Sequence, residues 1–101
     1  MDNLIKIGIS EDTINTINAN YGIYTLEDLN DSYLNVYKII NTFKELKIND
    51  EVITELLENS VNIFLMDYDT VLSKLKDKDL KIVADRINSN FIEAEKILYE
   101  E

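Results

Sequence analysis

The sequence contains no cysteine, histidine, proline or tryptophan, and only two of its 101 residues are glycine. Without cysteine the fold can use neither disulfides nor thiolate metal sites, which excludes a disulfide-dependent secreted scaffold. Without histidine or cysteine, the common zinc sites and the serine-, cysteine- and histidine-based catalytic mechanisms are excluded as well. Proline and glycine interrupt regular structure, so their scarcity beside many Ile, Leu, Glu and Lys residues favours a helical chain.

Positive charge is also scarce, because 10 basic residues face 20 acidic ones and leave a net charge of −10. This charge repels phosphate backbones and anionic lipids, so it argues against direct nucleic-acid binding through a basic face. No run approaches the ~18 apolar residues that a membrane span needs. The first residues, Met1 to Leu4, have neither the basic nor the apolar region of a signal peptide. We therefore expect a cytoplasmic protein with no membrane partner.

What the chain does have is a large apolar fraction, 46% of its residues. That content predicts one compact domain, residues 1–101, which buries about 65% of the surface exposed in the unfolded chain. The heavy use of Ile, Asn and Lys fits an AT-rich genome, such as those of many low-GC bacteria and their phages.

One stretch of the sequence occurs twice. Residues 46–57, LKINDEVITELL, are matched 39 positions earlier by residues 7–17, IGISEDTINTI. Each copy has a hydrophobic lead-in, a capping residue (Ser10 or Asn49), two acids and an apolar stripe at spacings of three and four. This is the pattern with which a short helix begins.

Helical spacing of apolar residues predicts helices at about 11–20, 26–30, 33–46, 50–59 and 69–77. The stretch Ile5–Ile9 alternates like a strand, but no second strand could pair with it, so we expect an extended lead-in. Gly22 is expected to end the first helix in the left-handed conformation. Val61–Met66 fits either a strand or a buried helical turn, and the repeat favours the helical alternative.

The C-terminal part has a sustained apolar stripe. Its members recur at intervals of 4, 3, 4, 3 and 4 residues: Leu80, Ala84, Ile87, Phe91, Ala94 and Leu98. This spacing predicts one long helix at about 79–98. The predicted fold is therefore all-α, a compact bundle or short repeat array of five to six helices. Two related helix-pair units, about 7–45 and 46–78, are closed by the long C-terminal helix, which acts as a cap.

The two copies, Ile-Gly-Ile-Ser-acid-acid and Leu-Lys-Ile-Asn-acid-acid followed by helical apolar spacing, resemble the helical repeat of the mitochondrial transcription termination factor family. The resemblance covers residues 7–76 and implies helix pairs stacked into a superhelix. Tyr21 and Ser60 replace the proline usual in that family. The family binds nucleic acid through basic surfaces, whereas residues 7–37 here carry five acids and residues 48–73 six, with no base in either range. The resemblance thus implies the architecture and not the nucleic-acid function.

A second similarity is to helix-hairpin-helix modules and the C-terminal domain of the polymerase alpha subunit. This similarity rests on two stretches, Ile7–Ser10 and the later Tyr-Gly-Ile-Tyr-Thr-Leu-Glu-Asp-Leu. Those hairpins need two glycines so that backbone amides can approach a phosphate. Here only Gly8 is present, Ser10 takes the second place, and no base follows.

The candidate binding site consists mainly of acidic residues. Capping explains those that begin each predicted helix, but Glu55 and Glu58 fall on the outer side of the 50–59 helix and need another reason. With the acids at positions 50, 51, 67 and 69 they would form a surface of a single sign of charge. The predicted partner-binding residues are Asp50, Glu51, Glu55, Glu58, Asp67, Tyr68 and Asp69.

The tyrosines divide into two groups. Tyr33 and Tyr37 lie on an apolar stripe, which indicates core positions. Tyr21, Tyr24 and Tyr68 lie near acids at the ends of predicted helices, where they could serve as interface anchors or in surface packing. Around Tyr68, the acid-x-acid pattern lacks the glycine and final glutamate of a calcium loop, so we expect a helix start and no metal or cofactor.

These observations favour a non-enzymatic, acidic protein–protein interaction module. The expected partner is a protein with a basic, nucleic-acid-binding surface, such as a host defence nuclease, and the expected role is that of a small inhibitor or immunity-type protein of a phage or bacterium. Two alternatives stay open: a structural subunit that forms a homodimer through its C-terminal helix, and a small nucleic-acid-associated regulator.

Overall fold

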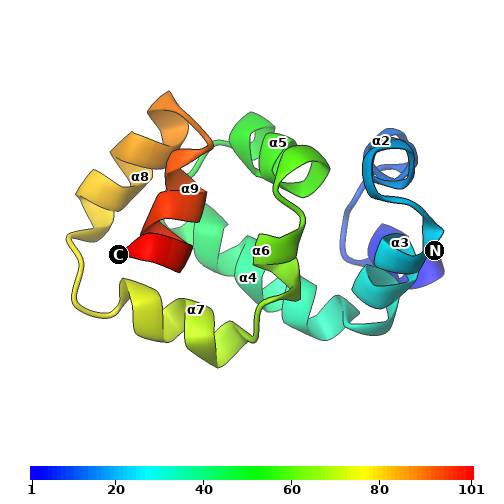
Figure 1. Cartoon of the computed structure of the whole chain (residues 1–101), viewed down its shortest axis with the longest axis horizontal. Helices are drawn as coiled ribbons and strands as arrows, with labels where there is room; N and C mark the ends of the chain where they lie inside the picture. The colour runs from blue at the N-terminus through cyan, green and yellow to red at the C-terminus, as the bar shows by residue number, and fades with distance from the viewer.

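The computed structural model describes all residues from Met1 to Glu101 and is helical throughout, without strands (Figure 1). The helices are α1 (Asp2–Lys6), α2 (Glu11–Tyr21), α3 (Ile23–Asp31), α4 (Tyr33–Glu45), α5 (Asp50–Asn59), α6 (Asn62–Leu65), α7 (Tyr68–Leu75), α8 (Leu80–Ser89), α9 (Glu93–Glu95) and the π-helix η1 (Lys96–Glu100). The all-α prediction is confirmed. The predicted number of five to six helices is wrong, because the nine α-helices include the short α1, α6 and α9.

Helix α4 lies at the centre of the fold and contacts α3, α5, α6 and α7. Its wide apolar stripe is the local cause, since a helix with such a stripe can bury residues on two sides. The Phe43 ring on α4 meets the Phe64 ring on α6 edge-on, with 5.8 Å between centroids. Tyr33 is half-buried against the core, as predicted, but Tyr37 lies on the outer side of α4 and is 42% exposed.

The lead-in before α2 is not extended throughout, because residues Asp2–Lys6 form α1. This helix ends in a Schellman turn: the amide of Gly8 donates to the Ile5 carbonyl and the amide of Ile9 donates to the Leu4 carbonyl at 3.1 Å. Gly8 has a φ of 96°, which only glycine adopts without strain. Gly8, predicted from the sequence to lie in an extended lead-in, therefore ends the preceding helix α1.

The same turn recurs 39 residues later, between α4 and α5. There the amide of Lys47 donates to the Lys44 carbonyl, and the amide of Ile48 donates to the Phe43 carbonyl at 3.0 Å. Lys47 has a φ of 70° and is the one non-glycine residue with a positive φ. The sequence repeat thus corresponds to a repeated connection, in which one helix ends and the next begins.

Helices α2 and α5, the two copies that follow these turns, pack against each other. The Ser10 hydroxyl accepts a hydrogen bond from the Thr13 amide at 3.2 Å and caps α2 as predicted. Asn49 is also an N-cap residue, but its side chain makes no capping bond; its own amide donates to Oδ1 of Asn88 at 2.8 Å. At the other ends, Nδ2 of Asn20 donates to the Glu58 carbonyl, so the two helices run in the same direction.

The predicted long closing helix at 79–98 does not form as one element. Asn90 is extended, with φ −158° and ψ 113°, and its side-chain oxygen accepts a hydrogen bond from the Ile92 amide. The chain then folds back, so that α9 packs against α8 and η1 packs against α7 (Figure 1). We call residues 80–101 the C-terminal hairpin. The apolar stripe continues across the break because both arms of this C-terminal hairpin face the same core. Phe91 is half-buried against that core.

Gly22 connects α2 directly to α3. Its φ of 92° and ψ of 172° differ from the left-handed helical cap that the sequence predicts. This region of backbone space is accessible almost only to glycine. The turn lets α3 begin at Ile23, with Leu26 and Leu29 directed into the core.

Candidate functional site

The structure places the predicted partner-binding residues in two separate groups. Asp50, Glu51 and Glu55 are exposed on α5 and Glu58 is half-buried at its end. The residues from Asp67 to Asp69 begin α7, on the opposite edge of the molecule (Figure 1). The single turn of α6 carries the chain from one edge to the other, so these acids do not form one continuous field.

The α7 group has cationic and polar neighbours from its own chain. The Lys38 ammonium lies 5.6 Å from the centroid of the Tyr68 ring, within the range of a cation–π contact. The Tyr68 amide donates to Oδ1 of Asn35 at 2.9 Å, and the Tyr68 side chain is half-buried against the core. Structural packing therefore accounts for Tyr68, which the sequence left open between packing and anchoring.

The α5 group continues into further acids, because α5 packs on α2 and α2 packs on α3. The cations beside it are Lys44 and Lys47, which lie near Asp50 at the start of α5. We call the three helices α2, α3 and α5 the acidic surface. They carry no lysine or arginine and nine carboxylates: Glu11, Asp12, Glu27, Asp28, Asp31, Asp50, Glu51, Glu55 and Glu58. None of the nine forms an ion pair within 4.0 Å; every ion pair of the chain joins Lys78, Arg86 or Lys96 to Glu93 or Glu101.

Sequence reasoning missed the contribution of α2 and α3 because capping gave their acids a sufficient local explanation. A usable signal was nevertheless present. The two longest stretches without a base, residues 7–37 and 48–73, contain all three helices. What the sequence could not show is that α5 packs beside α2 and not beside α7.

The C-terminal hairpin is electrostatically different. The Arg86 guanidinium donates to both carboxylate oxygens of Glu101, at 3.0 and 2.7 Å, and to Glu93 at 3.1 Å. These bonds raise the pKa of Arg86, and those from Lys96 and Arg86 lower the pKa of Glu93. The pKa of Glu101 is likewise lowered, chiefly by Arg86. The ion pairs of the chain are therefore concentrated at this end of the molecule, where Glu93 and Glu101 are paired and Asp85, Glu95 and Glu100 are not.

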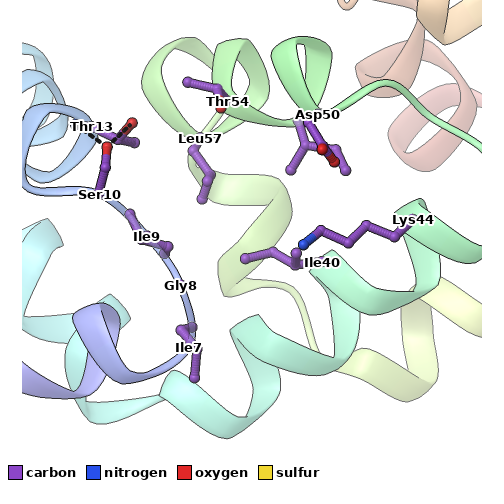
Figure 2. A pocket seen from close by; sticks show the side chains of 11 residues that line it. Ile7, Gly8, Ile9, Ser10, Thr13, Ile40, Lys44, Asp50, Thr54 and Leu57 are labelled. Atoms are coloured by element: carbon purple, nitrogen blue, oxygen red, sulfur yellow. Dashed lines mark hydrogen bonds between the residues drawn. The ribbon is translucent and has the colours of Figure 1, made fainter.

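A cleft of about 270 Å³ lies between the beginnings of α2 and α5 (Figure 2). Its apolar lining consists of Ile7, Ile9, Ile40, Ile53 and Leu57. Figure 2 shows the Lys44 side chain reaching into it from α4 and Asp50 facing it from α5. The Ser10 hydroxyl donates to the Thr13 hydroxyl at 3.1 Å on the α2 side. The cleft can take an apolar group from solvent at the edge of the acidic surface.

Three large apolar side chains are exposed at the corner where α2 meets α3. Tyr24 is 81% exposed, Ile23 46% and Tyr21 37%. We call these three residues the apolar corner. Tyr21 also lies near Tyr99 of η1: partial burial, then the nearby Glu95 and then Tyr21 raise the pKa of Tyr99.

A scan against protein-family models and searches of curated proteins and of solved structures found no match to this chain. No group of three or more acidic side chains is arranged to hold a metal ion. No helix is both long and apolar enough to cross a membrane.

Proposed function

We propose that this protein is a non-enzymatic interaction module whose acidic surface docks on the basic, nucleic-acid-binding surface of a protein partner and so acts as a small inhibitor. One observation carries the proposal: three packed helices carry nine carboxylates, eight of them exposed, with no base in these helices and no ion pair to any of the nine. Like charges held close together repel one another and lower the stability of the folded chain.

Electrostatic complementarity explains what such a surface can do. A patch of one sign accelerates encounter with a patch of the other sign and disfavours partners of its own sign. Proteins that bind nucleic acids present lysine and arginine arrays to phosphates. A rigid helical surface with a comparable density of negative charge competes for the same arrays, and its binding should weaken as salt rises.

Paired charge-reversal variants test the proposal. Glu51→Lys combined with Glu55→Lys changes two exposed residues one turn apart on α5. The control, Asp85→Lys with Glu100→Lys, changes net charge by the same amount on exposed, unpaired residues of the C-terminal hairpin. Both variants and the unmodified chain would be used for affinity capture from cells, with mass spectrometry and a salt elution series.

The unmodified chain and the control variant should capture the same basic proteins. The α5 variant should fail to capture them. Added salt or double-stranded DNA should release them, because both compete for the partner's cations. Capture of the same proteins by the α5 variant, or release insensitive to salt, would contradict it.

A further inference from the structure

We propose that the apolar corner of Tyr21, Ile23 and Tyr24 is the anchor of the docking surface, and that it enters an apolar recess ringed by lysine or arginine on the partner. This inference rests on the proposed function. It specifies the kind of surface that the partner presents, and it identifies the residues of this chain that contribute most of the binding free energy.

The corner is exposed because of how the backbone turns there. Gly22, at φ 92° and ψ 172°, joins α2 to α3 without an intervening loop. The inward positions of α3 are filled by Leu26 and Leu29, which are 3% and 0% exposed. Ile23 and Tyr24 are consequently left on the outer side, and Tyr24 has the largest exposed fraction of any large apolar side chain in the protein.

Two exposed acids of α3 lie beside the corner. Glu27 and Asp28 follow Tyr24 by three and four positions, so they lie on the same outer side of α3, and both are exposed. Protein interfaces are typically organised in this way, with aromatic anchors at the centre and a polar or charged rim. Tyrosine suits the anchor role because its ring is large and rigid and its hydroxyl can stay hydrated or bonded.

The negative charge beside the corner favours one class of binding partner, a basic protein surface. Anionic lipid and nucleic acid would bring phosphates against Glu27 and Asp28, and a second copy of this chain would bring a second set of carboxylates. A basic protein surface instead pairs its cations with the acids while its recess covers the rings. The acids then govern the rate of association, and the corner governs the rate of dissociation.

Two synthetic peptides of equal length and lysine content serve as probes, one with leucine between the lysines and the other with serine. Each would be titrated into the isotope-labelled full chain and followed by NMR. The lysine–leucine peptide should bind about tenfold or more tightly than the lysine–serine peptide, with the largest shifts at Tyr21, Ile23 and Tyr24. Tyr24→Ala should remove most of that difference, and Tyr24→Phe should keep it.

The matched control is Leu34→Ala, because Leu34 is 60% exposed but lies on α4 outside the acidic surface. It should leave both peptides unaffected. Circular dichroism checks that each variant is folded, which is expected because Tyr24 is outside the core.

Each failure has a distinct meaning. If both peptides bind with equal, salt-dependent affinity and Tyr24→Ala changes neither, the anchor is wrong and the acidic docking surface remains. If neither peptide binds in a salt-dependent way, the proposed function fails as well. Binding centred on Leu34 and Tyr37, Tyr24-dependent self-association in sedimentation, or Tyr24-dependent binding to phosphatidylserine vesicles would each overturn the anchor.

Discussion

Gly8 and Lys47 hold the same backbone position in two copies of one Schellman turn. Both have positive φ, 96° and 70°, and the same pair of hydrogen bonds surrounds each. A side chain with a Cβ is strained in this region by about 1–2 kcal/mol, whereas glycine is not. The second copy of the turn therefore carries a local strain that the first copy lacks.

Lys47→Gly should accordingly raise the free energy of unfolding by about 0.5–1 kcal/mol, after the extra chain entropy of glycine is subtracted. Lys47 is exposed, and its carbonyl, which accepts a hydrogen bond from Asn88, is retained in the variant. Urea denaturation measures the change. Gly8→Ala is the counterpart: a Cβ there has no neighbour within 4 Å, so a loss of about 1 kcal/mol would report backbone strain alone. A neutral result for both would show that the turn tolerates any residue.

Asn35 joins three helices through its side chain. Its Nδ2 donates to the Met66 carbonyl at 2.7 Å, and its Oδ1 accepts from the Tyr68 amide at 2.9 Å, so α4 holds the connection between α6 and α7. Asn35→Ala should lower the free energy of unfolding by about 1–3 kcal/mol, because both backbone groups lose their partner. Asn41→Ala, on the same helix, removes an amide with no hydrogen bond and should cost about 0.5 kcal/mol or less. Equal losses for the two variants would contradict this assignment.

Arg86 fixes the C-terminal hairpin through Glu93 and Glu101. Arg86→Gln should speed amide hydrogen exchange in residues 96–101. It should leave exchange in α2 and α5 unchanged, since those helices do not depend on the ion pairs of Arg86, which we call the clamp. Lys81→Gln is the control, because Lys81 is exposed on the same helix and forms no ion pair. Protection in residues 96–101 that survives Arg86→Gln would show that apolar packing alone holds the hairpin.

The same clamp makes stability depend on acid pH. The pKa values of Glu93 and Glu101 are both lowered from the usual 4.5, so their contribution is complete above about pH 4.5 and is lost as the pH falls through the lowered values. The difference in melting temperature between the unmodified chain and Arg86→Gln should therefore be largest near neutral pH and shrink below pH 4.5. In the variant, NMR titration should show the pKa of Glu101 returning further toward its usual value than that of Glu93, because Glu101 keeps only the 3.7 Å contact with Lys78, whereas Glu93 keeps Lys96, the largest cause of its lowered pKa.

Most helices could be predicted from the sequence because apolar spacing and capping are local signals. Ser10 and the acids after it identify the start of α2, and Asn49 identifies the start of α5. The break at Asn90 could not be predicted from spacing, because the apolar stripe records which side faces the core and not whether the backbone continues. Helix α1 was missed because Gly8 ends a helix that is only five residues long.

The sequence predicts that the candidate site is acidic, but it does not predict which helices come together to form it. Glu55 and Glu58 were recognisable as acids without a capping role, and they lie on the acidic surface. Their neighbours are set by the packing of α5 on α2, which is a long-range contact that no single stretch of sequence encodes. The exposure of Tyr24 follows in the same way from the turn at Gly22, where the observed backbone differs from the expected cap.

The uneven placement of the ion pairs has one more consequence. All the ion pairs of the chain involve the C-terminal hairpin, where three bases accompany five acids, whereas α2, α3 and α5 carry nine acids and no base, so the centre of negative charge is displaced from the centre of mass. Such a molecule has a large electric dipole moment and experiences a torque near any charged object. As it diffuses toward a positive surface it rotates, and the end with the unpaired carboxylates arrives first.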